Sequence, residues 1–224
     1  MNIVEIIPAI LPRDFTELET KIGLVSGFTK TVQIDICDGQ FVPNDATWPY
    51  RKHDDTFDKM LDQEDGLPNW ENLDYEFDLM VNKPEGKVEQ WISVGATRVI
   101  VHADAKGDIA AALEKLHGTV ESGLAINVVS SLDDLDKYRN LINFVQCMGI
   151  DHVGFQGQAF DEKVVDKIKR IRSKYPDMII SVDGGVSLDN ASKLIAAGAN
   201  RLVIGSAIFD AENPIDAIQK FRRL

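Results

Sequence analysis

Cysteine is scarce in this sequence. Only two of the 224 residues are cysteines, Cys37 and Cys147. Both lie in apolar runs of the kind that form strands, so we expect buried, free thiols. A disulfide framework, as found in small secreted proteins, is not expected, and a reducing compartment fits the composition.

Long apolar runs and an excess of basic charge are also missing. No apolar stretch reaches the length of a membrane span, and the N-terminal residues lack the basic region and the cleavage-like end of a signal peptide. Lysine and arginine number 24 against 36 acidic residues, which gives a net charge of −12. Nucleic acids and anionic membranes would be repelled by such a surface. We therefore expect a cytoplasmic protein with neither as a partner.

The chain does contain a regular alternation of β-rich runs and helical patterns. Strands are predicted at residues 3–11, 31–37, 74–81, 97–103, 124–129, 143–149, 178–185 and 201–207, and helical patterns follow them up to residue 224. Strands that alternate with helices predict a parallel sheet. Eight such units at this length predict an α/β fold with one (β/α)₈ TIM-barrel domain over residues 1–224.

One segment departs from this alternation. Residues 45–73, between the second and third predicted strands, are charged, contain two of the three tryptophans and include a short helical pattern at 55–61. We expect a loop over one end of the barrel. The segment can be a tolerated surface insertion, a lid over the site or a contact in a homo-oligomer.

Polar residues interrupt three strands that should be apolar on both faces. Because side chains alternate along a strand, Gln33 and Asp35 share one face, and Asp78 and Asp183 lie on the corresponding faces of their own strands. That face must be the barrel interior, and the carboxylates stand late in their strands, where barrel active sites lie. Three adjacent carboxylates must share protons, meet cations or bind a metal, although a structural hydrogen-bonded cluster is the simpler alternative.

Glycine-rich loops follow the last three predicted strands. They are "GFQGQ" from Gly154, "DGG" from Asp183 and "GSA" from Gly205. Glycines allow backbone N–H groups to approach a ligand, and the helix N-termini that follow favour an anion. Phosphate sites of this fold often use the loops after strands seven and eight. The candidate phosphate-binding residues are Gly154, Phe155, Gln156, Gly157, Gly184, Gly185, Gly205 and Ser206.

Several motifs resemble the ribulose-phosphate 3-epimerase family over nearly the whole chain. They are "IPAIL", "IDICDGQFVPN", "DLMVNKPE", "VGATRVIVHADA", "GFQGQAF", "VDGGV" and "AGANRLVIGSAIF". The resemblance implies interconversion of ribulose 5-phosphate and xylulose 5-phosphate through a planar enediolate, with a phosphosugar as the partner molecule. It also implies that Asp35 and Asp183 are the two acid–base groups and that Cys37, Met80 and Met148 form a sulfur-rich cap over the site.

The metal centre of the family is where this sequence differs. The usual ligands are two histidines and the two aspartates, but Gln33 and Asp78 stand at the positions of the histidines. Gln33, Asp35, Asp78 and Asp183 would form an all-oxygen set, which favours Mg²⁺ or Mn²⁺ over zinc. Alternatively no metal binds, and the amide of Gln33 donates to a ligand oxygen instead. Asp38 and Gly39 are expected to form the turn after the strand.

Three hypotheses about function remain after these observations. The first is a sugar-phosphate epimerase or isomerase, supported by both acid–base aspartates and the glycine loops. The second is a phosphosugar-binding paralogue, non-catalytic or of altered specificity, that has lost its metal centre. The third is an aldol-type or decarboxylating reaction on the same scaffold. No predicted strand contains a lysine, which disfavours a Schiff-base mechanism. We favour the first hypothesis.

Overall fold

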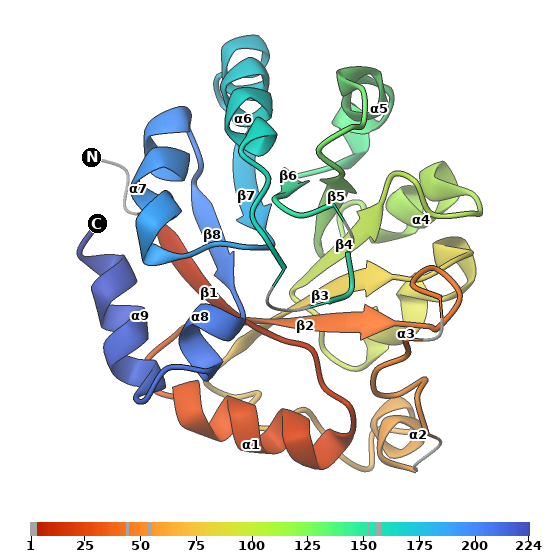
Figure 1. Cartoon of the computed structure of the whole chain (residues 1–224). Helices are drawn as coiled ribbons and strands as arrows, with labels where there is room; N and C mark the ends of the chain where they lie inside the picture. The colour runs from red at the N-terminus through yellow and green to blue at the C-terminus, as the bar shows by residue number, and fades with distance from the viewer. Residues whose placement is uncertain (1–3, 44, 53–54, 152, 156–157) are drawn as a thin grey trace.

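The computed structural model describes residues 4–43, 45–52, 55–151, 153–155 and 158–224. Eight parallel strands close into a barrel in sequential order, with β1 paired to both β2 and β8. Figure 1 shows the helices arranged as a ring outside these strands. The strands are β1 (Glu5–Ile10), β2 (Thr31–Cys37), β3 (Asp74–Met80), β4 (Arg98–His102), β5 (Glu121–Ile126), β6 (Phe144–Met148), β7 (Ile179–Asp183) and β8 (Arg201–Ile204). The predicted TIM barrel is confirmed.

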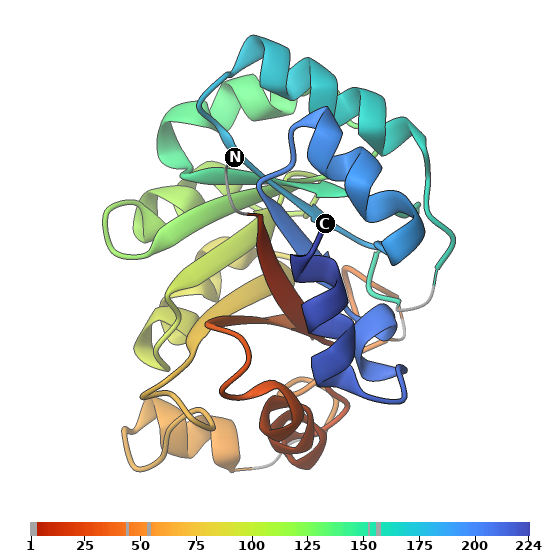
Figure 2. The ribbon, with the colours of Figure 1, turned by 90° about the vertical axis from the view of Figure 1, so that its left-hand side faces the viewer.

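Helices connect the strands and cover their outer faces. The α-helices are α1 (Phe15–Val25), α2 (Thr56–Leu61), α3 (Val88–Ser93), α4 (Ile109–Leu116), α5 (Leu132–Tyr138), α6 (Lys163–Lys174), α7 (Leu188–Ala197), α8 (Ser206–Phe209) and α9 (Pro214–Arg222). Two 3₁₀ turns, η1 (Pro84–Gly86) and η2 (Arg139–Leu141), precede α3 and follow α5. Figure 2, turned by 90°, shows α7 and α9 against the wall made by β8 and β1.

Alternation of side chains along β2 explains why the outer face of the barrel wall is apolar and the inner face is polar at this point. Val32, Ile34 and Ile36 point outward and are fully buried in the main hydrophobic cluster between strands and helices. The register sets Asp35 opposite Asp78 on the neighbouring strand. The same alternation therefore turns the polar members of both strands into the barrel interior.

Two predicted elements need correction at their ends. The fifth strand runs from Glu121 to Ile126 instead of 124–129. Directly after Ile126 the chain forms a turn in which Ser130 N donates to Asn127 O, and the backbone oxygens of both residues accept hydrogen bonds from Lys167 on α6. The eighth strand ends at Ile204, since α8 already begins at Ser206.

The segment 45–73 packs against the outside of the barrel. Its ring of Trp48 lies 5.5 Å from that of Phe57 and 6.3 Å from that of Trp91 on α3. The predicted short helix is confirmed as α2, which Figure 1 places beside α3 on the periphery. None of its described residues lines the pocket at the mouth of the barrel. A loop over one end of the barrel, with a role as a lid or in oligomer contact, stays a prediction.

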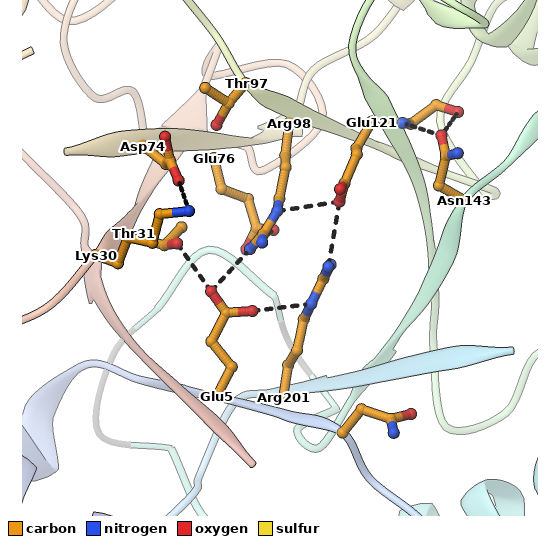
Figure 3. A network of polar contacts seen from close by, with 12 residues as sticks. Glu5, Lys30, Thr31, Asp74, Glu76, Thr97, Arg98, Glu121, Asn143 and Arg201 are labelled. Carbon is orange, nitrogen blue, oxygen red and sulfur yellow. Dashed lines mark hydrogen bonds and ion pairs between the residues drawn. The ribbon is translucent and has the colours of Figure 1, made fainter. Parts of the chain in front are cut away.

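The opposite end of the barrel is closed by charged side chains from the first residues of four strands. Arg98 and Arg201 each bridge Glu5 and Glu121, as Figure 3 shows. The contact distances lie between 3.1 and 3.2 Å. Glu76 lies above this ring inside the barrel, with its carboxylate 3.6 Å from Arg98. The alternation of acidic and basic side chains around this ring stabilises the floor of the barrel, away from its mouth.

Candidate active site

Three aspartates meet at the mouth of the barrel, as the sequence predicted. Asp35 and Asp78 come from adjacent strands, and Asp183 reaches them from the C-terminal end of β7. Each offers a carboxylate oxygen, and these oxygens lie within 4.8 Å of one another. Asp35 and Asp78 are buried, whereas Asp183 is partly exposed to the pocket. A concentration of negative charge at this depth requires protons, donors or a cation.

Gln33 lies between two of these carboxylates. Its Nε2 donates to Oδ1 of Asp35 at 2.8 Å and to Oδ2 of Asp183 at 2.8 Å. The side chain is fully buried, and its Oε1 has no hydrogen-bond partner among the described residues. Gln33 therefore joins the two predicted acid–base groups.

A second glutamine makes the matching bridge on the other side. Gln146 on β6 donates from Nε2 to Oδ2 of Asp78 at 3.2 Å and to Oδ2 of Asp183 at 3.3 Å. It is fully buried, and its Oε1 also lacks a partner in the described part of the chain. The sequence prediction missed Gln146, although it interrupts an apolar strand as the three aspartates do. That interruption was the signal that could have identified it.

His102 is the second functional residue that the sequence analysis did not place. Its Nε2 lies 3.0 Å from Oδ1 of Asp78, and both side chains are fully buried. Its ring lies 5.0 Å from that of Phe41 in the loop after β2. Burial lowers the pKa of His102, but the charge and hydrogen bond of Asp78 outweigh it, so the pKa is raised overall. A cationic His102 would neutralise part of the carboxylate charge.

The same electrostatics affect the two predicted acid–base groups. Burial, followed by the charges of Asp183 and Asp78, raises the pKa of Asp35 well above its usual range. Burial and the charge of Asp78 also raise the pKa of Asp183. Carboxyl groups with raised pKa values can hold and release protons near neutral pH, which is the property needed for general acid–base catalysis.

One pocket connects this cluster with the glycine loops. Its lining includes Asp35, Asp78, Asp183, Met80, Met148, Gly154, Phe155, Gly184, Gly185, Gly205 and Ser206. The structure thus brings together the described residues that were predicted for the carboxylate cluster and for the phosphate loops. Gln156 and Gly157, also predicted, lie outside the described residues.

Two of the three predicted sulfur-containing side chains line the pocket, one from β3 and one from β6. Sγ of Cys37 is 3.9 Å from Sδ of Met80. Met80 and Met148 line the pocket, while Cys37 is buried behind it. Burial raises the pKa of the Cys37 thiol, so it stays protonated. Both cysteines are free and buried, as expected.

The loop after β7 shows why glycine is required there. Gly184 and Gly185 have φ values of +96° and +68°, in the left-handed region. A Cβ on Gly185 would lie 2.9 Å from the Cα of Phe160. The start of α7 is less available to an anion than expected, because the backbone N–H of Ser187 donates to Oδ1 of Asn190. At Gly205, by contrast, the chain enters α8, whose first N–H groups have no intrahelical acceptor.

Asp38 has a structural role distinct from that of Asp35. Its Oδ1 accepts from the N–H groups of Gln40 and Phe41, and its Oδ2 accepts from Asn82 N and Lys87 Nζ. Burial raises the pKa of Asp38, but these donors, Lys87 first, lower it overall. The predicted turn after the strand is confirmed, with Gly39 at a φ of +72°.

The donor set of the cluster fits a hard divalent cation. Asp35, Asp78 and Asp183 supply carboxylate oxygens, and Oε1 of Gln33 is buried without a partner in the described residues. Oxygen ligands suit Mg²⁺ or Mn²⁺. His102, bound to Asp78, would orient that carboxylate as an outer-shell partner.

These features define a class of protein: a TIM barrel with a cluster of three carboxylates and glycine loops around one pocket at its mouth. The similarity to known proteins is more specific. A family model described as the ribulose-phosphate 3 epimerase family matches residues 5–209. The chain belongs to this family, and it is an isomerase of the carbohydrate-epimerase kind.

Individual relatives agree with this placement. The chain is 32% identical to the chloroplastic ribulose-5-phosphate-3-epimerase of Arabidopsis thaliana over 95% of this chain and 74% of the relative. It is 29% identical to the ribulose-phosphate 3-epimerase of Bacillus subtilis, covering 98% of each chain. The solved structure of 3-hexulose-6-phosphate synthase from Salmonella typhimurium matches with a TM-score of 0.69 at 13% identity, covering 98% of this chain and 97% of the other. That last likeness shows the fold alone. No helix in the described ranges is both long enough and apolar enough to cross a bilayer.

Proposed function

We propose that this protein interconverts ribulose 5-phosphate and xylulose 5-phosphate by inverting C3, with Asp35 and Asp183 as the two acid–base groups. The observation that supports this most is the bridge made by Gln33, which holds both carboxylates at 2.8 Å from one amide nitrogen. They come from β2 and β7, which are not neighbours in the barrel. A substrate above the bridge would have one carboxyl group on each side.

The proton transfers follow from this arrangement. One ionised aspartate removes the proton from C3, and the electron pair enters the adjacent carbonyl to give a planar enediolate. The other aspartate, still protonated, returns its proton to C3 on the opposite face. One proton has then moved from one carboxyl group to the other. The raised pKa values of both groups allow one to be protonated while its neighbour is ionised.

The rest of the pocket has binding roles in this proposal. Backbone N–H groups around Gly184, Gly185, Gly205 and Ser206 would bind the phosphate, with Gly154 and Phe155 on the facing loop. Met80 and Met148 would exclude water from the reacting carbon. A divalent metal, held by Asp35, Asp78, Asp183 and Gln33, would stabilise negative charge on the enediolate oxygens. A phosphosugar is thus the proposed small-molecule partner, and the cytoplasm the proposed location.

The test is proton exchange at C3. Purified protein with Mg²⁺, Mn²⁺, Fe²⁺ or Zn²⁺ is incubated with ribulose 5-phosphate in D₂O, and NMR follows xylulose 5-phosphate and deuterium at C3. We expect Asp183→Asn and Asp35→Asn to lower kcat by about 10²–10⁴-fold while leaving phosphate affinity in place. Asp104→Asn, at the mouth but outside the pocket lining, is the matched control. Wild-type protein without turnover under all four metals would contradict the proposal and favour a binding role or another substrate.

A further inference from the structure

Two buried glutamine amides occupy the centre of the carboxylate cluster, and Gln146 is the one without an assigned role. The amide of Gln33 spans Asp35 and Asp183, and that of Gln146 spans Asp78 and Asp183. Both side chains are fully buried, so their polar atoms cannot be satisfied by bulk solvent. An unpartnered buried amide oxygen costs free energy unless a ligand or water meets it.

We propose that Gln146 is a metal ligand through its Oε1, completing an all-oxygen site with Gln33 and the three aspartates. In the structure both amides turn their nitrogens to the carboxylates and leave Oε1 unpartnered within the described residues. A half-turn about the last side-chain bond exchanges the amide nitrogen and oxygen. Both oxygens then face the carboxylates, and a cation replaces the two hydrogen-bonding NH₂ groups as the source of positive charge.

The spacing of the amide and carboxylate atoms fits this exchange. Ligand oxygens about 2.1 Å from an octahedral Mg²⁺ are about 3.0 Å from their neighbours in the same shell. The amide nitrogen of Gln33 lies 2.8 Å from each of two carboxylate oxygens, and that of Gln146 lies 3.2 and 3.3 Å from two. These four separations bracket the edge of such an octahedron. The contacts of Gln146 are also long for a hydrogen bond to a carboxylate, so the amide is a loosely held donor there.

The alternative role of Gln146, as a hydrogen-bond donor only, predicts the opposite change in metal affinity. If Gln146 acts only as a donor, its NH₂ group competes with a cation for Asp78 and Asp183. Removing it would then leave metal affinity unchanged or increase it. If Gln146 is a ligand, removing it must weaken metal binding. The direction of the change separates the two roles.

The experiment measures Mn²⁺ binding to metal-free protein by the EPR signal of free Mn²⁺, without substrate. Gln146→Leu deletes the amide, and Gln146→Asn withdraws it by one methylene. We expect both to raise the Kd for Mn²⁺ at least about tenfold, the scale on which metal sites respond to the loss of a supporting group. Ser181→Ala is the matched control: Ser181 pairs with Gln146 across β6 and β7 and is equally buried. It should leave the Kd unchanged.

Thermal unfolding in EDTA shows whether each variant is folded. If Gln146→Leu does not fold, the Kd of Gln146→Asn still tests the proposal. An unchanged or lower Kd in a folded Gln146 variant would overturn the proposal, as would wild-type protein that binds no Mn²⁺. The inference builds on the metal assignment of the proposed function, but turnover is not measured here. If the wild type epimerises its substrate but the Gln146 variants keep the wild-type Kd for Mn²⁺, only the role of Gln146 is refuted. If the Gln146 variants bind Mn²⁺ more weakly but the wild type does not epimerise, only the proposed reaction is refuted.

Discussion

Glu76 should make the stability of this barrel decrease as the pH rises from mildly acidic to neutral. It is fully buried, 3.6 Å from Arg98, and neither carboxylate oxygen has a hydrogen-bond partner among the described residues. Burial, only partly offset by Arg98 and Arg201, raises the pKa of Glu76 from 4.5 to about 7. Between these values the folded protein binds a proton that the unfolded chain releases. The stabilisation that Glu76 contributes to the folded state is therefore fully present below pH 4.5 and is lost as the pH rises through 7.

The size of the effect follows from linkage. One proton difference changes the free energy of unfolding by about 1.4 kcal/mol per pH unit, so the whole window is worth at most about 3 kcal/mol. Glu76→Gln keeps the shape of the side chain but cannot ionise. The stability of the wild type should thus fall between pH 4.5 and 7.5 by up to about 3 kcal/mol more than that of Glu76→Gln, or roughly 6–12 °C in Tm.

The assay is urea and thermal unfolding of both proteins across this pH range in EDTA. Glu5→Gln is a control of opposite sign. Glu5 contacts the same two arginines, and Arg98, ahead of Arg201, helps to lower its pKa in spite of burial. The stabilisation that Glu5 contributes is present above the pKa that Glu5 has in the unfolded chain, and it is lost as the pH falls. Parallel pH profiles for wild type and Glu76→Gln would refute the reasoning about a raised pKa.

Three further predictions concern the site. The kcat/KM should begin to fall toward acid at a pH well above the ordinary aspartate pKa of 3.8, because burial raises the pKa values of Asp35 and Asp183 and one of them must be ionised. A kcat/KM that does not change down to pH 4.5 would contradict this. The double variant Gln33→His with Asp78→His should gain zinc affinity by titration, and no gain would mean that the geometry has diverged beyond these two side chains. Gly185→Ala should destabilise the fold by about 1–3 kcal/mol, measured as Tm, because its φ is +68° and its Cβ would approach Phe160; an unchanged Tm would show that this loop relaxes.

Sequence periodicity predicted most of the fold and the position of the carboxylates for one physical reason. In a barrel strand both faces are buried, so a charged residue such as Asp35 is visible against an apolar background. The position along the strand then fixes its depth, and register brings Asp35 beside Asp78. Gln146 and His102 give a weaker signal than a carboxylate. Each interrupts an apolar strand, but only their contacts with Asp78 indicate a role.

Sequence patterns did not predict the ring of charged side chains at the floor of the barrel. Glu5, Arg98, Glu121 and Arg201 each begin a strand, and strand ends are the least regular part of any periodic pattern. Their ring depends on the closure of the barrel, which brings β1 and β8 beside each other and sets their register with Glu5 opposite Arg201. The packing of Trp48 in the segment 45–73 was not predicted for a related reason, because its burial against Trp91 depends on where α3 lies.

The polar centre of the barrel requires compensation of its charge in every state. Three buried carboxylates cannot all be ionised without a partner. Two features compensate this charge within the described residues: the donors Gln33 and Gln146, and His102 beside Asp78. The raised pKa values of Asp35 and Asp183 favour protons on these carboxyl groups as a further compensation. A divalent cation would provide it at the same oxygen atoms, so protons and metal must compete for them. Metal affinity should therefore rise with pH, and the acid limb of the rate should move to lower pH as the metal concentration increases. In the proposed function, protonation of Asp35 and Asp183 is therefore expected to be coupled directly to metal binding.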